Sequence, residues 1–158
     1  MILTRRTLLA TGTMFLAAPY VRASSPVVVD MLNKHPDDPK QRQIFLPRLV
    51  VIDPGQSVLF KATDPGHNAA SVDGMIPEGA EPWEGKIGKD IEVEFTQPGV
   101  YGYVCTPHAA AGMVGVVVVQ GEGALDNLEA AKAVKQRAKG KRVFAEIWEE
   151  IDQLGLSG

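Results

Sequence analysis

The single cysteine of the chain, Cys105, is followed three positions later by His108 and eight positions later by Met113. A second histidine, His67, comes directly after Gly66. Thiolate and thioether sulfur are soft donors that favour Cu(I), while imidazole binds copper in both oxidation states. One cysteine, two histidines and a weak axial methionine are the donors typical of a blue-copper electron-transfer site. The residue types therefore predict a copper centre.

The spacing of the motif supports this prediction. Cys105 closes one expected strand and Met113 opens the next, so the segment between them must reverse direction. Pro107 and Gly112 favour that reversal. A Cys-x2-His-x4-Met turn would point three donors toward one place, where His67 would be the fourth.

Other chemistries remain open from the residues alone. A lone buried cysteine is commonly a small apolar core residue. Zinc is poorly served by a thioether, and a covalently attached haem would need a Cys-x-x-Cys-His motif that the chain lacks. A nucleophilic Cys–His enzyme would need an orienting group and an oxyanion pocket, and it would leave Met113 without a role.

A polar residue beside each ligand segment could tie the predicted site together. Asn68 follows His67, and Thr106 follows Cys105. The Asn68 side chain could bridge to Thr106, and its backbone N–H could reach the Cys105 sulfur. An ordinary turn asparagine is the alternative interpretation.

The elements that must position these residues are mostly strands. Sixteen glycines and eleven prolines indicate many turns and an all-β fold. A long irregular connection is expected over 74–89. A first helix is expected from Leu125 to near Gly140 and a second over 143–154, because apolar residues recur there at helical spacing. Strands are expected over 27–32, 44–52 (an edge or bulged strand, because of Pro47), 57–61, a short segment after His67, 91–95, 100–104 and 113–119.

The N-terminus has the pattern of an export signal. Residues 1–23 contain Arg5 and Arg6, a short apolar stretch and small residues before the expected cleavage point. The segment also resembles a twin-arginine signal. We therefore expect cleavage of 1–23, periplasmic localisation, and a single domain over 24–158 with a helical extension at about 122–155.

Charge and hydropathy exclude some classes of partner. Sixteen basic residues, less the three in 1–23, leave thirteen against nineteen acidic ones, so the mature chain carries a net charge of −6. This argues against nucleic-acid binding. The apolar stretch of the signal is too short to span a bilayer, so no stable membrane insertion is expected. We expect a monomer.

In these motifs and in the segments around them, the chain resembles the pseudoazurins, type 1 copper proteins of the cupredoxin family. The segments that carry the resemblance occur in family order: "DMLNK", "DPGQSVLF", "GHN", "MIPEGAE", "FTQPGVY", "CTPH" and "GM". The resemblance implies an eight-stranded Greek-key β-sandwich with two C-terminal α-helices. It also implies one copper ion held by His67, Cys105, His108 and Met113.

The resemblance implies a one-electron carrier and not an enzyme. Its partners would be periplasmic redox proteins such as copper nitrite reductase or a cytochrome-type donor or acceptor. Electrons would leave through the exposed edge of the second histidine ligand, within an apolar docking patch. The patch expected here comprises His108, Pro107, Ala109, Ala110, Ala111, Met75 and Pro77. A copper-binding or delivery protein is the alternative function.

The sequence departs from the family around that patch. Lysines that family members often carry before the cysteine and before the Gly-His pair are replaced by Val104 and Pro65. Residues 82–85, Pro-Trp-Glu-Gly, also lack expected lysines, and Ala109 stands where a bulky aromatic is common. These changes predict weaker electrostatic steering or a different partner.

Overall fold

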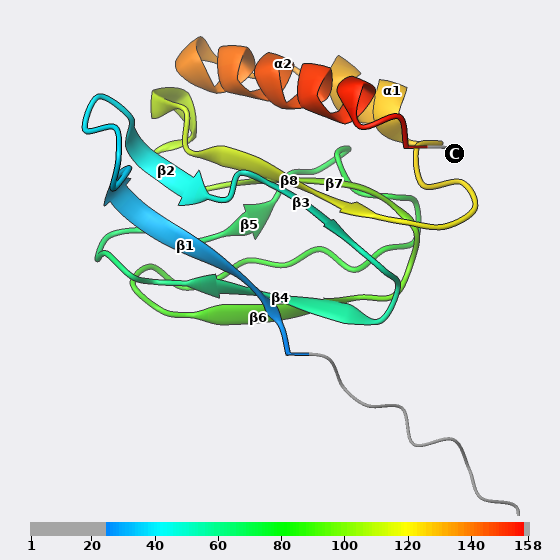
Figure 1. The fold of residues 1–158 in the computed structure, drawn as a ribbon, viewed down its shortest axis with the longest axis horizontal. Coiled ribbons are helices and arrows are strands. Elements are labelled where there is room, and N and C mark those ends of the chain that lie inside the picture. The colour runs from blue at the N-terminus through cyan, green and yellow to red at the C-terminus, as the bar shows by residue number, and fades with distance from the viewer. Residues whose placement is uncertain (1–24, 157–158) are drawn as a thin grey trace, which may run out of the picture.

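The computed structural model describes residues 25–156, so the predicted signal segment 1–23 lies outside the described residues. Eight strands form two four-stranded sheets that pack face to face, and two helices cover one sheet (Figure 1). This is the predicted cupredoxin β-sandwich with two C-terminal helices. The predicted copper site lies at one end of it.

The first sheet has the order β2-β1-β4-β6. β1 pairs antiparallel with β2 and parallel with β4, while β4 pairs antiparallel with β6. Alternating apolar and polar residues in β6 match one buried and one solvated face. The strands span Val27–Lys34 (β1), Arg42–Leu46 (β2), Gln56–Lys61 (β4) and Ile91–Phe95 (β6).

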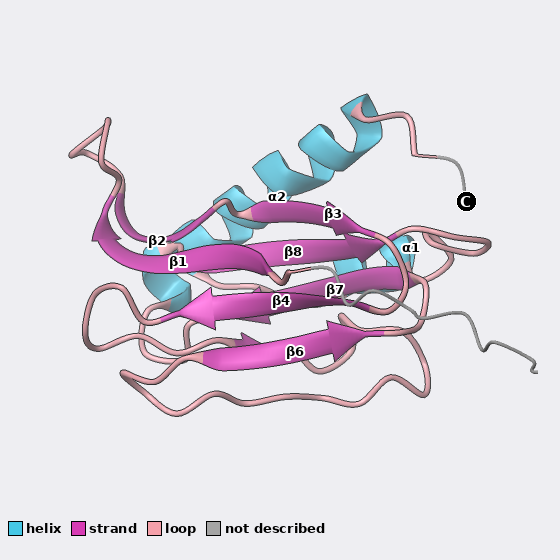
Figure 2. Ribbon diagram, turned by 60° about the horizontal axis from the view of Figure 1, so that its bottom comes forward, coloured by secondary structure: helices cyan, strands magenta, loops and turns pink. Residues whose placement is uncertain are grey.

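The second sheet has the order β3-β8-β7-β5. β8 is buried along its whole length, as its unbroken β-branched sequence predicts, because one face meets the other sheet and the other face meets the helices. Figure 2 shows β8 between β3 and β7, with the helices behind it. The strands span Leu49–Ile52 (β3), Ala70–Ser71 (β5), Gly99–Val104 (β7) and Val114–Val119 (β8).

The prediction of a single strand over 44–52 is wrong. The chain forms β2, breaks at a cis Leu46–Pro47 bond, and continues as β3 in the opposite sheet. Proline cannot donate a ladder hydrogen bond, so pairing stops where it occurs. Both strands are edge strands, as the proline indicates, and the break lets one chain segment bridge the two sheets.

Two apolar cores hold these layers together. The core between the sheets is aromatic-rich, with Tyr103 packed edge-on against both Phe45 and Phe60 at centroid distances of 4.8 Å. The core between β8 and the helices is aliphatic and includes Val116, with Ile147 and other residues of the longer helix. The second core fixes the longer helix against the sheet that carries Cys105 at its end.

The helices differ from their predicted bounds. A 3₁₀ turn, η1, spans Ala109–Ala111, α1 spans Leu128–Ala133 and α2 spans Ala138–Gln153. Gly140 lies inside α2 and does not end the first helix as expected. A Cβ atom at this position would stand 2.5 Å from the Ala109 carbonyl oxygen, so glycine is required by close packing against η1. The sequence pattern cannot separate that role from helix termination.

Candidate metal centre

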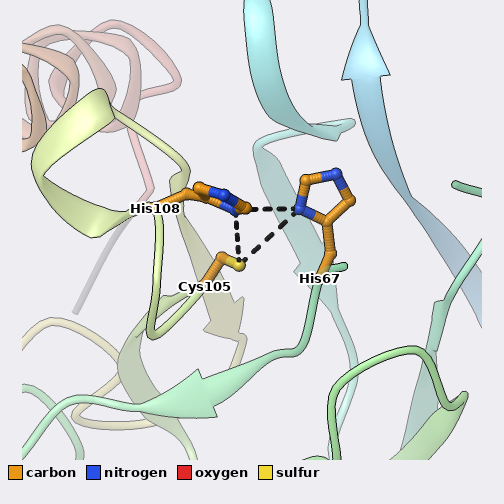
Figure 3. A group of neighbouring side chains, drawn as sticks. All are labelled: His67, Cys105 and His108. Atoms are coloured by element: carbon orange, nitrogen blue, oxygen red, sulfur yellow. Dashed lines mark hydrogen bonds between the residues drawn. The ribbon is translucent and has the colours of Figure 1, made fainter. Parts of the chain in front are cut away.

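The candidate ligands come from two segments at one end of the sandwich: the β4–β5 connection and the loop from β7 to β8. His67 lies between β4 and β5, and Cys105 directly follows β7. His108 lies in the turn that leads into η1, and Met113 directly precedes β8. Figure 3 shows the side chains of Cys105 and His108, which belong to one loop, converging with that of His67 from a separate backbone segment.

The donor atoms of three residues form a compact triangle. The Nδ1 atoms of His67 and His108 are 3.1 Å apart. The Cys105 sulfur is 3.8 Å from Nδ1 of His67 and 3.5 Å from Nδ1 of His108. Within the described part of the chain, these three residues form a group that could hold a metal ion.

The triangle fits a single first-row metal ion. Divalent zinc, an ion of similar size to copper, binds imidazole nitrogen at about 2.0 Å and thiolate sulfur at about 2.3 Å, so donors that share one ion lie roughly 3 to 4 Å apart. All three separations in this site fall within that range. The donor set itself, two imidazoles and one thiol with a buried methionine beside them, is the set that suits copper.

Backbone hydrogen bonds hold the ligand loop in shape. The N–H of Cys105 donates to the carbonyl of Met113 at 3.0 Å, which places the two ends of the loop side by side. The N–H of His108 donates back to the Cys105 carbonyl, and that of Met113 donates to the His108 carbonyl. Gly112 takes φ of 98°, a left-handed conformation that favours glycine and completes the reversal. The loop predicted from Cys-x2-His-x4-Met is therefore present.

Burial favours the uncharged forms of the metal-free ligands. His67, Cys105 and Met113 are 0% exposed, whereas His108 is partly exposed. Burial, and then the neighbouring His108, lower the pKa of His67, which Asp64 only partly offsets. Burial raises the pKa of Cys105, against hydrogen bonds from the backbone N–H groups of Asn68 and His108. Metal binding must therefore displace the thiol proton.

Asn68 joins the two ligand-bearing segments, as predicted. Its side-chain N–H₂ donates to the Thr106 hydroxyl at 3.0 Å and to the Gly85 carbonyl at 3.0 Å. Its side-chain oxygen accepts from the backbone N–H of Thr106 at 2.9 Å. Because Asn68 is only 3% exposed, these bonds are shielded from water.

A further contact with a ligand was not foreseen from the sequence. The Nε2 atom of His67 lies 3.0 Å from the side-chain oxygen of Asn33, at the end of β1. An amide oxygen only accepts hydrogen bonds, so Nε2 carries the proton and Nδ1 keeps the lone pair that faces Cys105. The backbone N–H of Asn33 in turn donates to Asp64 at 2.6 Å. No spacing rule connects residues so far apart in the chain.

Two residues of the predicted docking patch, Met75 and Pro77, do not lie on the surface around His108. Met75 is 0% exposed and lies beneath Gly102, in contact with Gln136. Pro77 is buried against Gly99, at the opposite end of β7 from Cys105. The chain from Val72 to Pro77 runs alongside β7 toward the end of that strand opposite Cys105, so these residues lie away from the site although they follow His67 closely in the sequence.

The surface around His108 is nevertheless largely apolar. Pro107 and Ala110 are exposed, and Ala109 and Ala111 are partly exposed. Ile87 is 60% exposed, and its neighbour Gly88 donates a backbone hydrogen bond to the His67 carbonyl at 2.8 Å. Ile87 is thus an exposed apolar residue beside the site, and no motif in the sequence indicates it.

Comparison with known proteins places this site in a family. Residues 37–120 match the family described as copper binding proteins, plastocyanin/azurin family. The chain is 41% identical to a pseudoazurin from Methylorubrum extorquens, over 92% of this chain and 97% of that protein. It is 39% identical to a pseudoazurin from Paracoccus pantotrophus, over 87% and 91% of the two chains.

Solved structures agree with the sequence matches. The crystal structure of pseudoazurin from Methylobacterium extorquens AM1 superimposes with a TM-score of 0.74 at 38% identity, covering 80% of this chain and 99% of that one. Fold, donor cluster and sequence similarity thus converge on the same group of copper proteins. The chain belongs to the pseudoazurins, within the plastocyanin/azurin family of copper-binding proteins.

Proposed function

We propose that this chain is a periplasmic one-electron carrier whose copper is held by His67, Cys105, His108 and Met113. Membership in the pseudoazurins makes it a copper protein of the electron-carrier class and not an enzyme. The observation that carries the proposal is the triangle of one buried thiol and two imidazole Nδ1 atoms at separations of 3.1 to 3.8 Å.

The protein's contribution is a rigid set of donors. When bound, copper supplies a one-electron couple between Cu(II) and Cu(I). Cys105 is held by the end of β7, His108 by the turn into η1, and Met113 by the start of β8. The Asn33 and Asn68 hydrogen bonds fix the orientation of His67 and the spacing of its segment from Thr106. Donors that stay in place require little rearrangement when an electron moves.

His108 is the proposed exit for electrons. It is the ligand with an exposed part, whereas His67, Cys105 and Met113 are fully buried. Pro107, Ala109 and Ala110 give it an apolar surrounding. Ile87 is also exposed, and its neighbour Gly88 is hydrogen-bonded to the His67 backbone. An apolar surface of this kind lets a partner approach closely and exclude water between the two redox centres.

The burial of the proposed ligands favours an electron carrier over a copper-delivery protein. A delivery protein must hand over its ion, so its donors need to be accessible to a receiving protein. Three of the four proposed ligands are 0% exposed and held by short backbone segments. Fast electron self-exchange between Cu(I) and Cu(II) forms, with no loss of copper to an added chelator on that timescale, would separate a carrier from a delivery protein.

Periplasmic localisation is supported by the export-signal pattern of residues 1–23. Within residues 25–156, no helix has the length and apolar character needed to cross a membrane. A redox enzyme such as copper nitrite reductase, or a cytochrome-type protein, is the proposed partner, and the chain is proposed to act as a monomer.

Stopped-flow kinetics test the proposed function. The reduced protein is mixed with copper nitrite reductase, and the oxidised protein with a reduced c-type cytochrome, while the copper absorbance is followed. An Ala110→Asp variant places a negative charge beside His108. Whichever of the two partners reacts faster with the unmodified protein, this variant should slow that reaction by about ten-fold or more. Ala130→Asp, at an exposed position of α1, is the matched control and should leave the rate unchanged. Equal rates for both variants would contradict exit through the His108 surface.

A further inference from the structure

Basic residues are concentrated in one short segment of an acidic protein. Residues 130–145 contain six of the thirteen basic residues of the mature chain and no acidic residue. The rest of the mature chain carries all nineteen acidic residues against seven basic ones. The segment includes the first turns of α2, where Lys139 and Arg142 lie three residues apart and Lys141 lies between them.

This basic segment lies against the turn that carries His108. Gly140 packs against the Ala109 carbonyl, and the side-chain carbons of Lys139 lie over Gly112. Figure 1 shows the start of α2 directly above the turn at the copper end of the sandwich. Positive charge is therefore present beside the proposed electron exit, although the positions of Val104 and Pro65 lack it.

A groove of about 660 Å³ runs along the same side of α2. Gly112, Lys139 and Arg142 line its wall near the copper loop, and Lys40 lies on the wall formed by the β1–β2 connection. The apolar residues Phe45, Leu49 and Val114 are also among those that line it. We call this surface the basic groove, defined by the four basic residues Lys40, Arg48, Lys139 and Arg142.

Much of the positive charge in the basic groove is not neutralised. Arg48 pairs with both Glu146 and Glu150, so the two acidic residues of the groove are engaged by that one guanidinium. Arg142 approaches Glu146 only at 3.8 Å, and among the described residues no ion pair involves Lys40 or Lys139. The end of the groove nearest Gly112 is thus left with net positive charge.

The opposite end of the molecule is acidic. A hollow of about 400 Å³ there is lined by Glu78, Glu122 and Asp126, with no basic residue among those that line it. It adjoins Pro98, which precedes β7, whereas Cys105 follows the end of the same strand. Such a charge separation would orient the protein with its copper end toward an acidic partner.

We propose that the basic groove is the docking site for an acidic surface segment of the redox partner, which would bring the partner's redox centre to His108. The inference rests on the proposed electron-carrier function and specifies the partner's chemistry. The carboxylates of the partner would meet Lys139 and Arg142 at the end of the groove beside Gly112. The positive charge that steers the partner would then lie at the start of α2, and not at positions 65 and 104, where family members often carry lysines.

The test compares two double variants that remove equal charge from the two sides of the copper end. Lys139→Gln with Arg142→Gln alters the basic groove. Lys61→Gln with Lys89→Gln alters the exposed surface on the side of His67 and is the matched control. The probe is an oligoglutamate peptide, titrated into the reduced, copper-loaded protein at low salt while backbone amide NMR shifts are recorded.

The proposal predicts peptide-induced shifts centred on Gly112, Lys139 and Lys40 that disappear at high salt. The groove variant should weaken peptide binding and slow low-salt electron transfer to copper nitrite reductase by about ten-fold, whereas the control variant should change both by less than about two-fold. Shifts centred on Lys61 and Lys89, absence of peptide binding, or binding of the groove only to anionic phospholipid vesicles would each overturn it.

The result is separable from a failure of the proposed function. Loss of the copper chromophore or of electron self-exchange in the unmodified protein would count against the carrier function itself. Normal self-exchange with no difference between the two double variants would contradict only the basic-groove docking site.

Discussion

Asn33 and His67 are joined by a hydrogen bond of 3.0 Å between the amide oxygen and Nε2 of the imidazole. The bond determines which ring nitrogen of His67 faces Cys105. It also connects β1 to the metal centre, because Asn33 lies near the end of that strand and its backbone is held by Asp64. The ligand geometry therefore depends on both sheets of the sandwich.

Removing this bond should weaken copper binding. An Asn33→Leu variant leaves Nε2 without its acceptor and allows the His67 ring to rotate or change tautomer, so copper affinity should fall by about 10- to 100-fold. Asn33→Asp retains an acceptor and should restore most of the affinity. Competition titrations with a chelator measure the effect, with Lys34→Ala as a control on the neighbouring exposed residue. Unchanged affinity in Asn33→Leu would show that the contact does not orient the ligand.

Asn68 should contribute more to stability than its partner Thr106. Asn68→Ala removes three hydrogen bonds in a buried place and leaves the Thr106 N–H without its acceptor, which should cost about 2–4 kcal/mol of unfolding free energy. Thr106→Ala keeps the backbone bond and should cost about 1 kcal/mol. Denaturant unfolding of the copper-loaded proteins measures both losses. Equal losses of unfolding free energy in the two variants would contradict the larger contribution of Asn68.

Gly140→Ala should perturb the metal site although it improves helix propensity. Alanine is favoured over glycine inside a helix by about 1 kcal/mol, but its Cβ would stand 2.5 Å from the Ala109 carbonyl oxygen. We expect a net loss of about 1–3 kcal/mol from overpacking and a change in the visible spectrum as the His108 turn moves. The control is Ala145→Gly at an exposed position of α2, and this variant should lose about 1 kcal/mol with no spectral change. A more stable Gly140→Ala protein with an unchanged spectrum would refute the packing argument.

Tyr103 should make the protein sensitive to alkaline pH. Burial raises the pKa of its phenol far above the ordinary value of 10.0, so the phenol stays protonated in the folded protein and ionises on unfolding. The unfolded state then binds fewer protons above about pH 10, and the unfolding free energy falls as pH rises. Tyr103→Phe should remove that part of the alkaline loss.

The same substitution tests an unsatisfied polar atom. The Tyr103 hydroxyl is buried without a hydrogen-bond partner, which costs about 1–3 kcal/mol. Tyr103→Phe should therefore be as stable as the unmodified protein at neutral pH, or more stable by about 1 kcal/mol. Urea unfolding of the copper-loaded proteins at neutral and alkaline pH measures both effects. A destabilised phenylalanine variant would indicate that the hydroxyl does have a stabilising contact.

Much of the fold follows from local patterns in the sequence. The alternation in β6 and the β-branched run of β8 predict a half-buried and a fully buried strand, and the structure has both. The Cys-x2-His-x4-Met spacing predicts a reversing loop because its ends fall at strand termini. These predictions succeed because their causes lie within a few residues of each other.

The features that the sequence patterns did not predict depend on packing between distant segments. Gly140 is required by the approach of Ala109, and Met75 is buried by Gly102 and the helices. Asn33 meets His67 only because β1 and the segment after β4 end at the same side of the sandwich. Such relationships are set by tertiary structure, so no local spacing reveals them.

The visible spectrum of the copper(II) protein tests the central claim most directly. Cys105 thiolate bound together with the His67 and His108 imidazoles should give an intense blue colour in the folded protein. The colour should disappear in Cys105→Ser while circular dichroism shows that the β-sandwich persists. A folded unmodified protein that binds copper without blue colour, or a Cys105→Ser variant that remains blue, would contradict the proposed copper centre.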